Sequence, residues 1–95
     1  PLSQAEIMAD LHEAVFSWPD AGAHDVIVTG TFDNWSSSIH MTKTPSGFEA
    51  KVKVPWGQKI LYKFVVDGTW LAAQGQPTEL DGWTVNNFYH APEKP

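Results

Sequence analysis

The stretch FEAKVKV, residues 48–54, is the feature that most narrows the folds open to this chain. Apolar and charged side chains alternate along it: Phe48, Ala50, Val52 and Val54 against Glu49, Lys51 and Lys53. Successive side chains of a strand point to opposite faces. The alternation therefore predicts a half-buried antiparallel strand, with one face on an apolar core and the other in water.

Similar β patterns recur along most of the chain, separated by residues typical of turns. Besides residues 48–54, we expect strands at residues 14–18, 25–32, 39–44, 59–66, 69–72 and 84–90. Asp67 and Gly68 predict a tight hairpin, whereas residues 73–83 are expected to form a long polar loop. About seven short strands with closely spaced turns predict an all-β fold, either a sandwich or a small barrel.

Two of these strands have faces that the sequence assigns in detail. Val26 and Val28 share one face of their strand, while Ile27 and Thr29 share the other. In residues 59–66 the two faces hold different sets: Tyr62, Phe64 and Val66 against Leu61, Lys63 and Val65. We therefore expect Lys63 to point away from the apolar core.

The length of 95 residues suits a single domain. We expect the β-sandwich to span residues 14–90, between a flexible or partly helical tail at residues 1–13 and a second tail at residues 91–95. Met8 is a candidate for the natural start of the chain.

Charge and composition argue against several classes of partner. The formal net charge is -5, and all six basic residues are lysines. A surface that follows phosphates collects Lys and Arg, so binding to nucleic acid and to anionic membranes is disfavoured. Cysteine is absent, and no apolar run approaches the length of a transmembrane helix. Neither does the N-terminal stretch have the pattern of a secretory signal, so we expect a cytoplasmic protein.

The sequence lacks a pattern typical of a catalytic or metal centre. None of the four histidines has metal-ligand spacing to another ligand: His12, His24, His40 and His90. Acidic residues of the predicted loops, such as Asp33 and Asp67, occupy turn-forming positions. We therefore expect a protein without enzymatic activity and without a cofactor or metal.

Three of the five tryptophans lie beside predicted loops or hairpins: Trp35, Trp70 and Trp83. Each ring, taken alone, could equally well cap one end of a sandwich. Together they favour sugar binding, because flat indole faces suit the apolar C–H faces of a pyranose ring.

Three stretches in order along the chain carry a resemblance to a known family. VIVTGTFDNW at residues 26–35, LYKFVVDGTW at 61–70 and TVNNF at 84–88 resemble the landmark motifs of family 48 carbohydrate-binding modules. The glycogen-binding domain of the AMP-activated protein kinase beta subunit and related fungal modules are members. The resemblance implies an immunoglobulin-like β-sandwich that binds α-1,4-linked glucan, including maltooligosaccharides such as β-cyclodextrin, without cleaving it.

The family motifs assign roles to five positions of this sequence. By resemblance, Trp35 and Trp70 are stacking platforms, while Lys63, Thr84 and Asn86 make polar contacts with the sugar.

One family position has no direct match. The kinase-type domains carry a Leu on the loop before the last motif, where this chain has Gly82 and Trp83. Leu80 and Trp83 are the candidates to replace it.

Two other functions stay open beside glucan binding. The same sandwich could serve as a protein-interaction module, since sheet edges and exposed aromatics also bind partners. Structure-selective DNA binding, described for some fungal relatives, is disfavoured by the acidic composition. A domain this small is expected to be a module of a larger protein.

Overall fold

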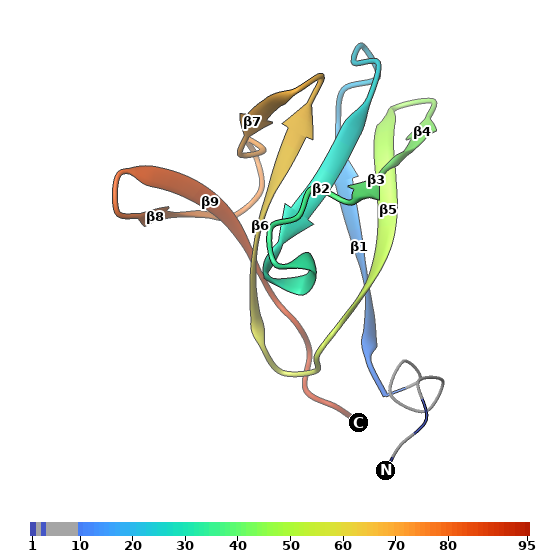
Figure 1. The fold of residues 1–95 in the computed structure, drawn as a ribbon, viewed down its shortest axis with the longest axis vertical. Helices are drawn as coiled ribbons and strands as arrows, with labels where there is room; N and C mark the ends of the chain where they lie inside the picture. The colour runs from blue at the N-terminus through green and yellow to red at the C-terminus, as the bar shows by residue number, and fades with distance from the viewer. Residues whose placement is uncertain (2, 4–9) are drawn as a thin grey trace.

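The computed structural model describes Pro1, Ser3 and residues 10–95, and this part of the chain contains nine strands and one short 3-10 helix (Figure 1). The strands are β1 (His12–Trp18), β2 (Val26–Gly30), β3 (Ile39–His40), β4 (Thr42–Thr44), β5 (Gly47–Val54), β6 (Lys59–Val66), β7 (Thr69–Leu71), β8 (Thr78–Asp81) and β9 (Thr84–His90). The 3-10 helix η1 (Thr31–Asp33) follows β2 directly. No helix in the described residues is long and apolar enough to cross a membrane.

The strands form two antiparallel sheets. The smaller has the order β1-β5-β4; the larger has the order β3-β2-β6-β9-β8, with β7 paired to β6. This arrangement confirms the predicted all-β sandwich. Figure 1 shows the β8–β9 hairpin projecting sideways from the body, while β6 runs through the middle of its sheet.

The hydrophobic core lies between the two sheets and uses the alternating positions expected from the sequence. In β5, Phe48, Val52 and Val54 are buried while the charged residues between them are exposed. Val26 and Val28 of β2 are fully buried, as is Phe64 of β6. Aromatic rings tie the layers together: the Phe16 and Tyr62 centroids are 4.7 Å apart, and those of Trp18 and Phe64 are 5.1 Å apart.

Several boundaries differ from those expected. β1 starts at His12, so His12 and Glu13 of the predicted tail pair with Val54 and Lys53 of β5. The stretch 39–44 is two strands, because β3 pairs with β2 in the larger sheet whereas β4 pairs with β5 in the smaller one. Met41 lies between them and is buried. The flexible or partly helical tail expected at residues 1–13 falls mainly on residues outside those described.

The predicted loop 73–83 contains a strand. β8 (Thr78–Asp81) pairs with β9 and forms the edge of the larger sheet. Its sequence, TELD, has a weak β pattern, and the strand exists because β9 offers it hydrogen-bond partners. At the other end of β9, Ala91 is buried and its N–H donates to the Gln58 carbonyl at 2.9 Å, so the chain stays packed past the last strand.

Candidate functional site

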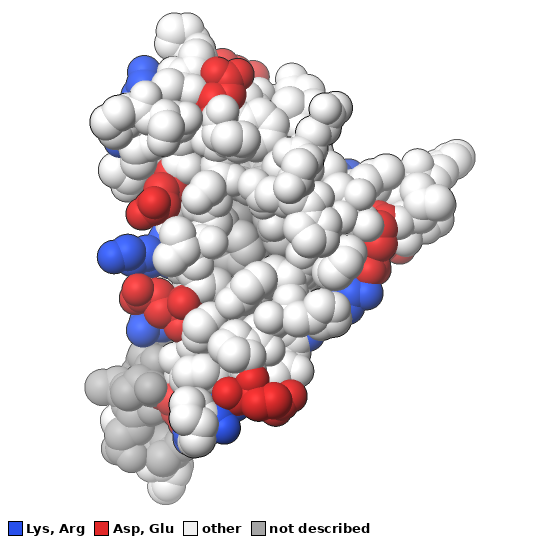
Figure 2. Space-filling model, turned by 180° about the vertical axis from the view of Figure 1, so that it is seen from behind, with Lys and Arg blue, Asp and Glu red and all other residues white. Residues whose placement is uncertain are grey.

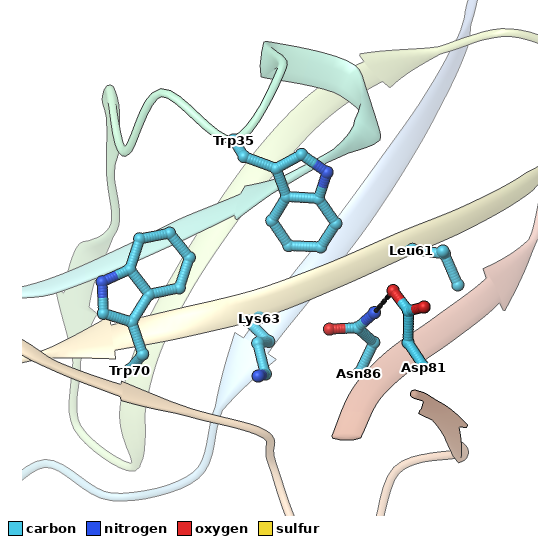
Figure 3. Close-up of a pocket in the computed structure, with 6 residues that line it drawn as sticks. All are labelled: Trp35, Leu61, Lys63, Trp70, Asp81 and Asn86. Atoms are coloured by element: carbon cyan, nitrogen blue, oxygen red, sulfur yellow. Dashed lines mark hydrogen bonds between the residues drawn. The ribbon is translucent and has the colours of Figure 1, made fainter. Parts of the chain in front are cut away.

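The outer face of the larger sheet carries an open concavity of about 320 Å³ (Figure 3). Segments far apart in the sequence contribute its six lining residues: Trp35, Leu61, Lys63, Trp70, Asp81 and Asn86. Figure 3 shows Lys63 between Trp70 on one side and the Asn86–Asp81 pair on the other. The fold therefore brings four of the predicted sugar-binding residues together at one site.

Trp35 is held by a turn built around the carboxylate of Asp33. The Asp33 carboxylate accepts hydrogen bonds from the Gly30 N–H at 2.9 Å, the Trp35 N–H at 3.1 Å and the Thr29 hydroxyl at 2.9 Å. The Ser36 hydroxyl adds a longer bond at 3.3 Å. Thr29 was expected on the outer face of β2, but it is fully buried because its hydroxyl lies inside this network.

The backbone of the same turn is strained. Asn34, Trp35 and Ser37 have φ of 54°, 59° and 57°, in the left-handed region that non-glycine residues rarely adopt. Such conformations persist only where surrounding interactions hold them. The Asp33 bonds supply that restraint, together with a bond from the Trp35 N–H to the Gly30 carbonyl at 2.9 Å.

Trp70 is placed by the β6–β7 hairpin, whose two-residue turn was predicted from the sequence. Asp67 and Gly68 both have positive φ, 49° and 87°, as a type I′ turn requires. The Asp67 carboxylate also accepts hydrogen bonds from the backbone N–H groups of His24 and Asp25, at 2.9 and 2.8 Å. Asp67 therefore contributes its backbone to the turn, and its side chain ties the hairpin to the neighbouring loop. Trp70, two residues after the turn, is 47 % exposed.

Polar groups from β6, β8 and β9 form the rest of the site. The Lys63 ammonium donates to the Thr84 hydroxyl at 2.6 Å, and the Asn86 amide donates to the Asp81 carboxylate at 3.1 Å. Thr84 does not itself line the concavity, but its hydroxyl is the hydrogen-bond partner of Lys63, which does.

The register of the β8–β9 hairpin decides where Leu80 and Trp83 lie. Asp81 is opposite Thr84 and Leu80 is opposite Val85, so Leu80 and Val85 share the face turned away from the site. Trp83 occupies the turn at the tip of the hairpin and is fully exposed, while Leu80 is 75 % exposed. Neither candidate for the family's loop Leu lines the concavity.

Two lining residues were missed by reasoning from sequence. The strand alternation placed Leu61 on the same outward face as Lys63, and this shared face was the signal that could have identified it. Because Leu61 is apolar, it was not included among the candidate binding residues. Asp81 falls within residues 73–83, which were expected to form a polar loop. Its position in the site depends on the pairing of β8 with β9.

The histidines are scattered over the described part of the molecule. His40 pairs with Asp25 at 3.0 Å on the surface, and His12 bonds to the Tyr89 hydroxyl at 2.8 Å. Among the described residues no group of three or more His, Cys, Asp or Glu side chains is arranged to hold a metal ion.

Fold and site together define a small antiparallel β-sandwich module with two tryptophans and a polar wall around one open concavity. The family described as the glycogen recognition site of AMP-activated protein kinase matches residues 12–94. The chain belongs to this family, which confirms the resemblance drawn from its three motifs and supports carbohydrate binding at the level of the family.

Yeast proteins are among the relatives of this chain. It is 37 % identical over 86 residues to the signal transduction protein MDG1 of Saccharomyces cerevisiae strain YJM789, an alignment covering 86 % of this chain and 23 % of the relative. It is 43 % identical over 78 residues to cruciform DNA-recognizing protein 1 of strain RM11-1a, covering 77 % of this chain and 17 % of the relative. The chain thus spans less than a quarter of the length of either protein.

Proposed function

We propose that this domain binds α-1,4-linked glucan, such as glycogen, starch or a maltooligosaccharide, without cleaving it. The observation that carries the proposal is the convergence of Trp35, Trp70, Lys63 and Asn86 on one concavity. The indoles supply apolar faces for pyranose rings, and the ammonium and amide supply partners for the hydroxyls between them.

The size of the site suggests weak binding to a single short chain. Covering one pyranose face removes about 100 Å² of apolar surface, a gross gain of about 2.5 kcal/mol. Association costs at least several kcal/mol, so two platforms and a few hydrogen bonds correspond to dissociation constants of roughly micromolar to millimolar. A polymer that engages several copies of the domain raises the effective affinity.

Tryptophan fluorescence during titration with β-cyclodextrin or maltoheptaose tests the proposal. Trp35→Ala and Trp70→Ala should each abolish the response and the retention on glycogen in a native gel, while thermal unfolding stays close to that of the wild type. Trp83→Ala is the matched control, because it removes a fully exposed indole that lies outside the concavity. Glycogen retention by both site variants would refute the assignment of the site.

Salt dependence separates this function from binding to DNA. A neutral glucan releases no counterions, so its affinity should hardly change between low and high salt, whereas DNA binding weakens steeply. Figure 2 shows acidic and basic side chains interspersed on the face it displays, not a basic stripe of the kind that follows phosphates.

Binding of a partner protein is a second candidate, favoured by a separate observation. Leu80, Trp83 and Val85 leave an exposed apolar surface on the projecting hairpin, 75 %, 100 % and 37 % exposed respectively. Loss of a partner in a Leu80→Ser variant that still binds glucan would assign this surface. We further propose that the domain acts in the cytoplasm as a module of a longer protein, since the yeast relatives are several times its length.

A further inference from the structure

Asn86 is the most deeply buried polar side chain that lines the concavity, with 4 % of its surface exposed. Its Nδ2 donates to the Asp81 carboxylate at 3.1 Å. The described part of the chain supplies no hydrogen-bond donor to its Oδ1, which borders the concavity. This oxygen is not sealed from solvent. A ligand in the concavity can therefore reach it and donate a hydrogen bond to it.

The chemistry of Asp81 fixes which way this amide points. An ionised carboxylate only accepts hydrogen bonds, so Asn86 must present its NH₂ group to Asp81. Figure 3 shows the consequence: the Asn86 oxygen points away from Asp81, toward the Lys63 side of the site. A flipped amide would instead turn its N–H donors toward the Lys63 side of the site and leave the carboxylate without its partner.

Lys63 is the donor that complements this acceptor. Its ammonium has three N–H groups, of which one is used by the Thr84 hydroxyl at 2.6 Å. The polar wall therefore offers a donor at Lys63 and an acceptor at Asn86. Two adjacent hydroxyls of a sugar match this pattern when one accepts from Lys63 and its neighbour donates to Asn86.

We propose that Asp81 is a positioning residue that sets the donor and acceptor order of the site, and thereby makes the site selective for a sugar with a free hydroxyl that can donate to Asn86. This inference rests on the proposed glucan binding. It assigns a function to β8, because only the pairing of β8 with β9 brings the Asp81 carboxylate to the amide.

The neighbouring acid on β8 provides a matched control. Glu79 lies directly opposite Asn86 in the register of the hairpin, and on the same face as Asp81. Its carboxylate instead forms an ion pair with Lys59, and it does not line the concavity. Glu79→Gln thus removes one acid from the same strand without disturbing the amide.

The test compares β-cyclodextrin with permethylated β-cyclodextrin, which keeps its ether oxygens but has no hydroxyl to donate. Asp81→Ala should weaken β-cyclodextrin binding about tenfold, the effect of one lost hydrogen bond, and leave the weaker binding of the permethylated ring unchanged. Asp81→Asn, whose carbonyl still accepts from Asn86, should stay within about threefold of the wild type. Glu79→Gln should match the wild type with both ligands.

An NMR readout follows the amide itself. The Asn86 side-chain NH₂ resonances should shift in Asp81→Ala, with only small changes in Asp81→Asn and Glu79→Gln. The positioning role is overturned if Asp81→Ala binds β-cyclodextrin like the wild type, or if it weakens both ligands equally. Either result would leave the proposed glucan binding standing, provided that the wild type binds β-cyclodextrin and Trp70→Ala does not. The proposed function itself is refuted if the wild-type protein fails to bind β-cyclodextrin at millimolar concentration.

Discussion

Replacing Asp33 by alanine removes the acceptor on which the Trp35 turn depends, and its effect can be worked out from the contacts. The variant loses two backbone N–H bonds, from Gly30 and Trp35, and leaves the fully buried Thr29 hydroxyl without its acceptor. At about 1.5–2 kcal/mol for each bond to a charged group, the gross loss of the three bonds is about 4.5–6 kcal/mol. The Ser36 bond to the same carboxylate is long, at 3.3 Å, and adds little to this loss.

Relaxation of the turn returns part of that loss. With the carboxylate gone, Trp35 loses one of the bonds that hold its left-handed conformation and can move to an unstrained one. This recovers about 1–2 kcal/mol, the strain of one such residue. The net destabilisation is about 3 kcal/mol. For a domain of this size the unfolding midpoint should fall by about 12–24 °C, at 4–8 °C for each kcal/mol.

The relaxed turn no longer holds the Trp35 ring at the concavity, so Asp33→Ala should lose both stability and β-cyclodextrin binding. Trp35→Ala should lose binding while its unfolding midpoint stays close to that of the wild type. Thermal denaturation and fluorescence titration of both variants separate these effects. Asp20→Ala is the control, since Asp20 makes one exposed turn bond, to the Gly22 N–H at 2.8 Å, and should cost no more than about 1 kcal/mol. Unchanged stability and affinity in Asp33→Ala would refute the reasoning.

Three further changes test the fold around the site. Gly30→Ala should destabilise the domain by more than about 2 kcal/mol, because the new Cβ would lie 2.1 Å from the Leu61 carbonyl oxygen; a thermal midpoint equal to the wild type contradicts this. Asn87→Leu should cost about 3 kcal/mol in urea unfolding, since the buried Asn87 amide bonds both backbone groups of Ala73 at 2.7 and 2.9 Å; a cost below 1 kcal/mol contradicts it. Burial raises the pKa of Tyr62 above its usual 10.0, so the folded state holds the proton more tightly; stability is complete below pH 10 and falls as pH rises beyond it. Alkaline unfolding should show this loss in the wild type, and a Tyr62→Phe variant with the same loss would refute the assignment.

The local chemistry of the chain was enough to predict much of the site. The DG pair predicts a turn that needs positive φ at both residues, and the structure has that turn beneath Trp70. Alternation in residues 59–66 places Lys63 opposite the core residues Tyr62 and Phe64, and Lys63 does line the outer concavity. These predictions succeed because turn conformation and strand alternation are properties of a few consecutive residues.

Other features depend on contacts between distant segments. The TELD segment becomes β8 only when β9 provides its hydrogen-bond partners, so Asp81 could not be assigned to the site from its neighbours in sequence. The same pairing turns Leu80 to the opposite face, and the hairpin turn carries Trp83 to an exposed tip. A register is set by which strands meet, and a shift of one residue would exchange the faces of every side chain.

The sequence by itself determined that this chain is an antiparallel β protein with Lys63 opposite the core face of its strand and with Trp35 and Trp70 beside turns, because alternation and turn residues act over short stretches. Only the tertiary structure decided that Asp81 and Leu61 complete the concavity, that Asp33 holds the strained turn, and that the Asn86 amide donates to Asp81. Each of these depends on hydrogen bonds and burial that arise when strands from different parts of the chain pack side by side.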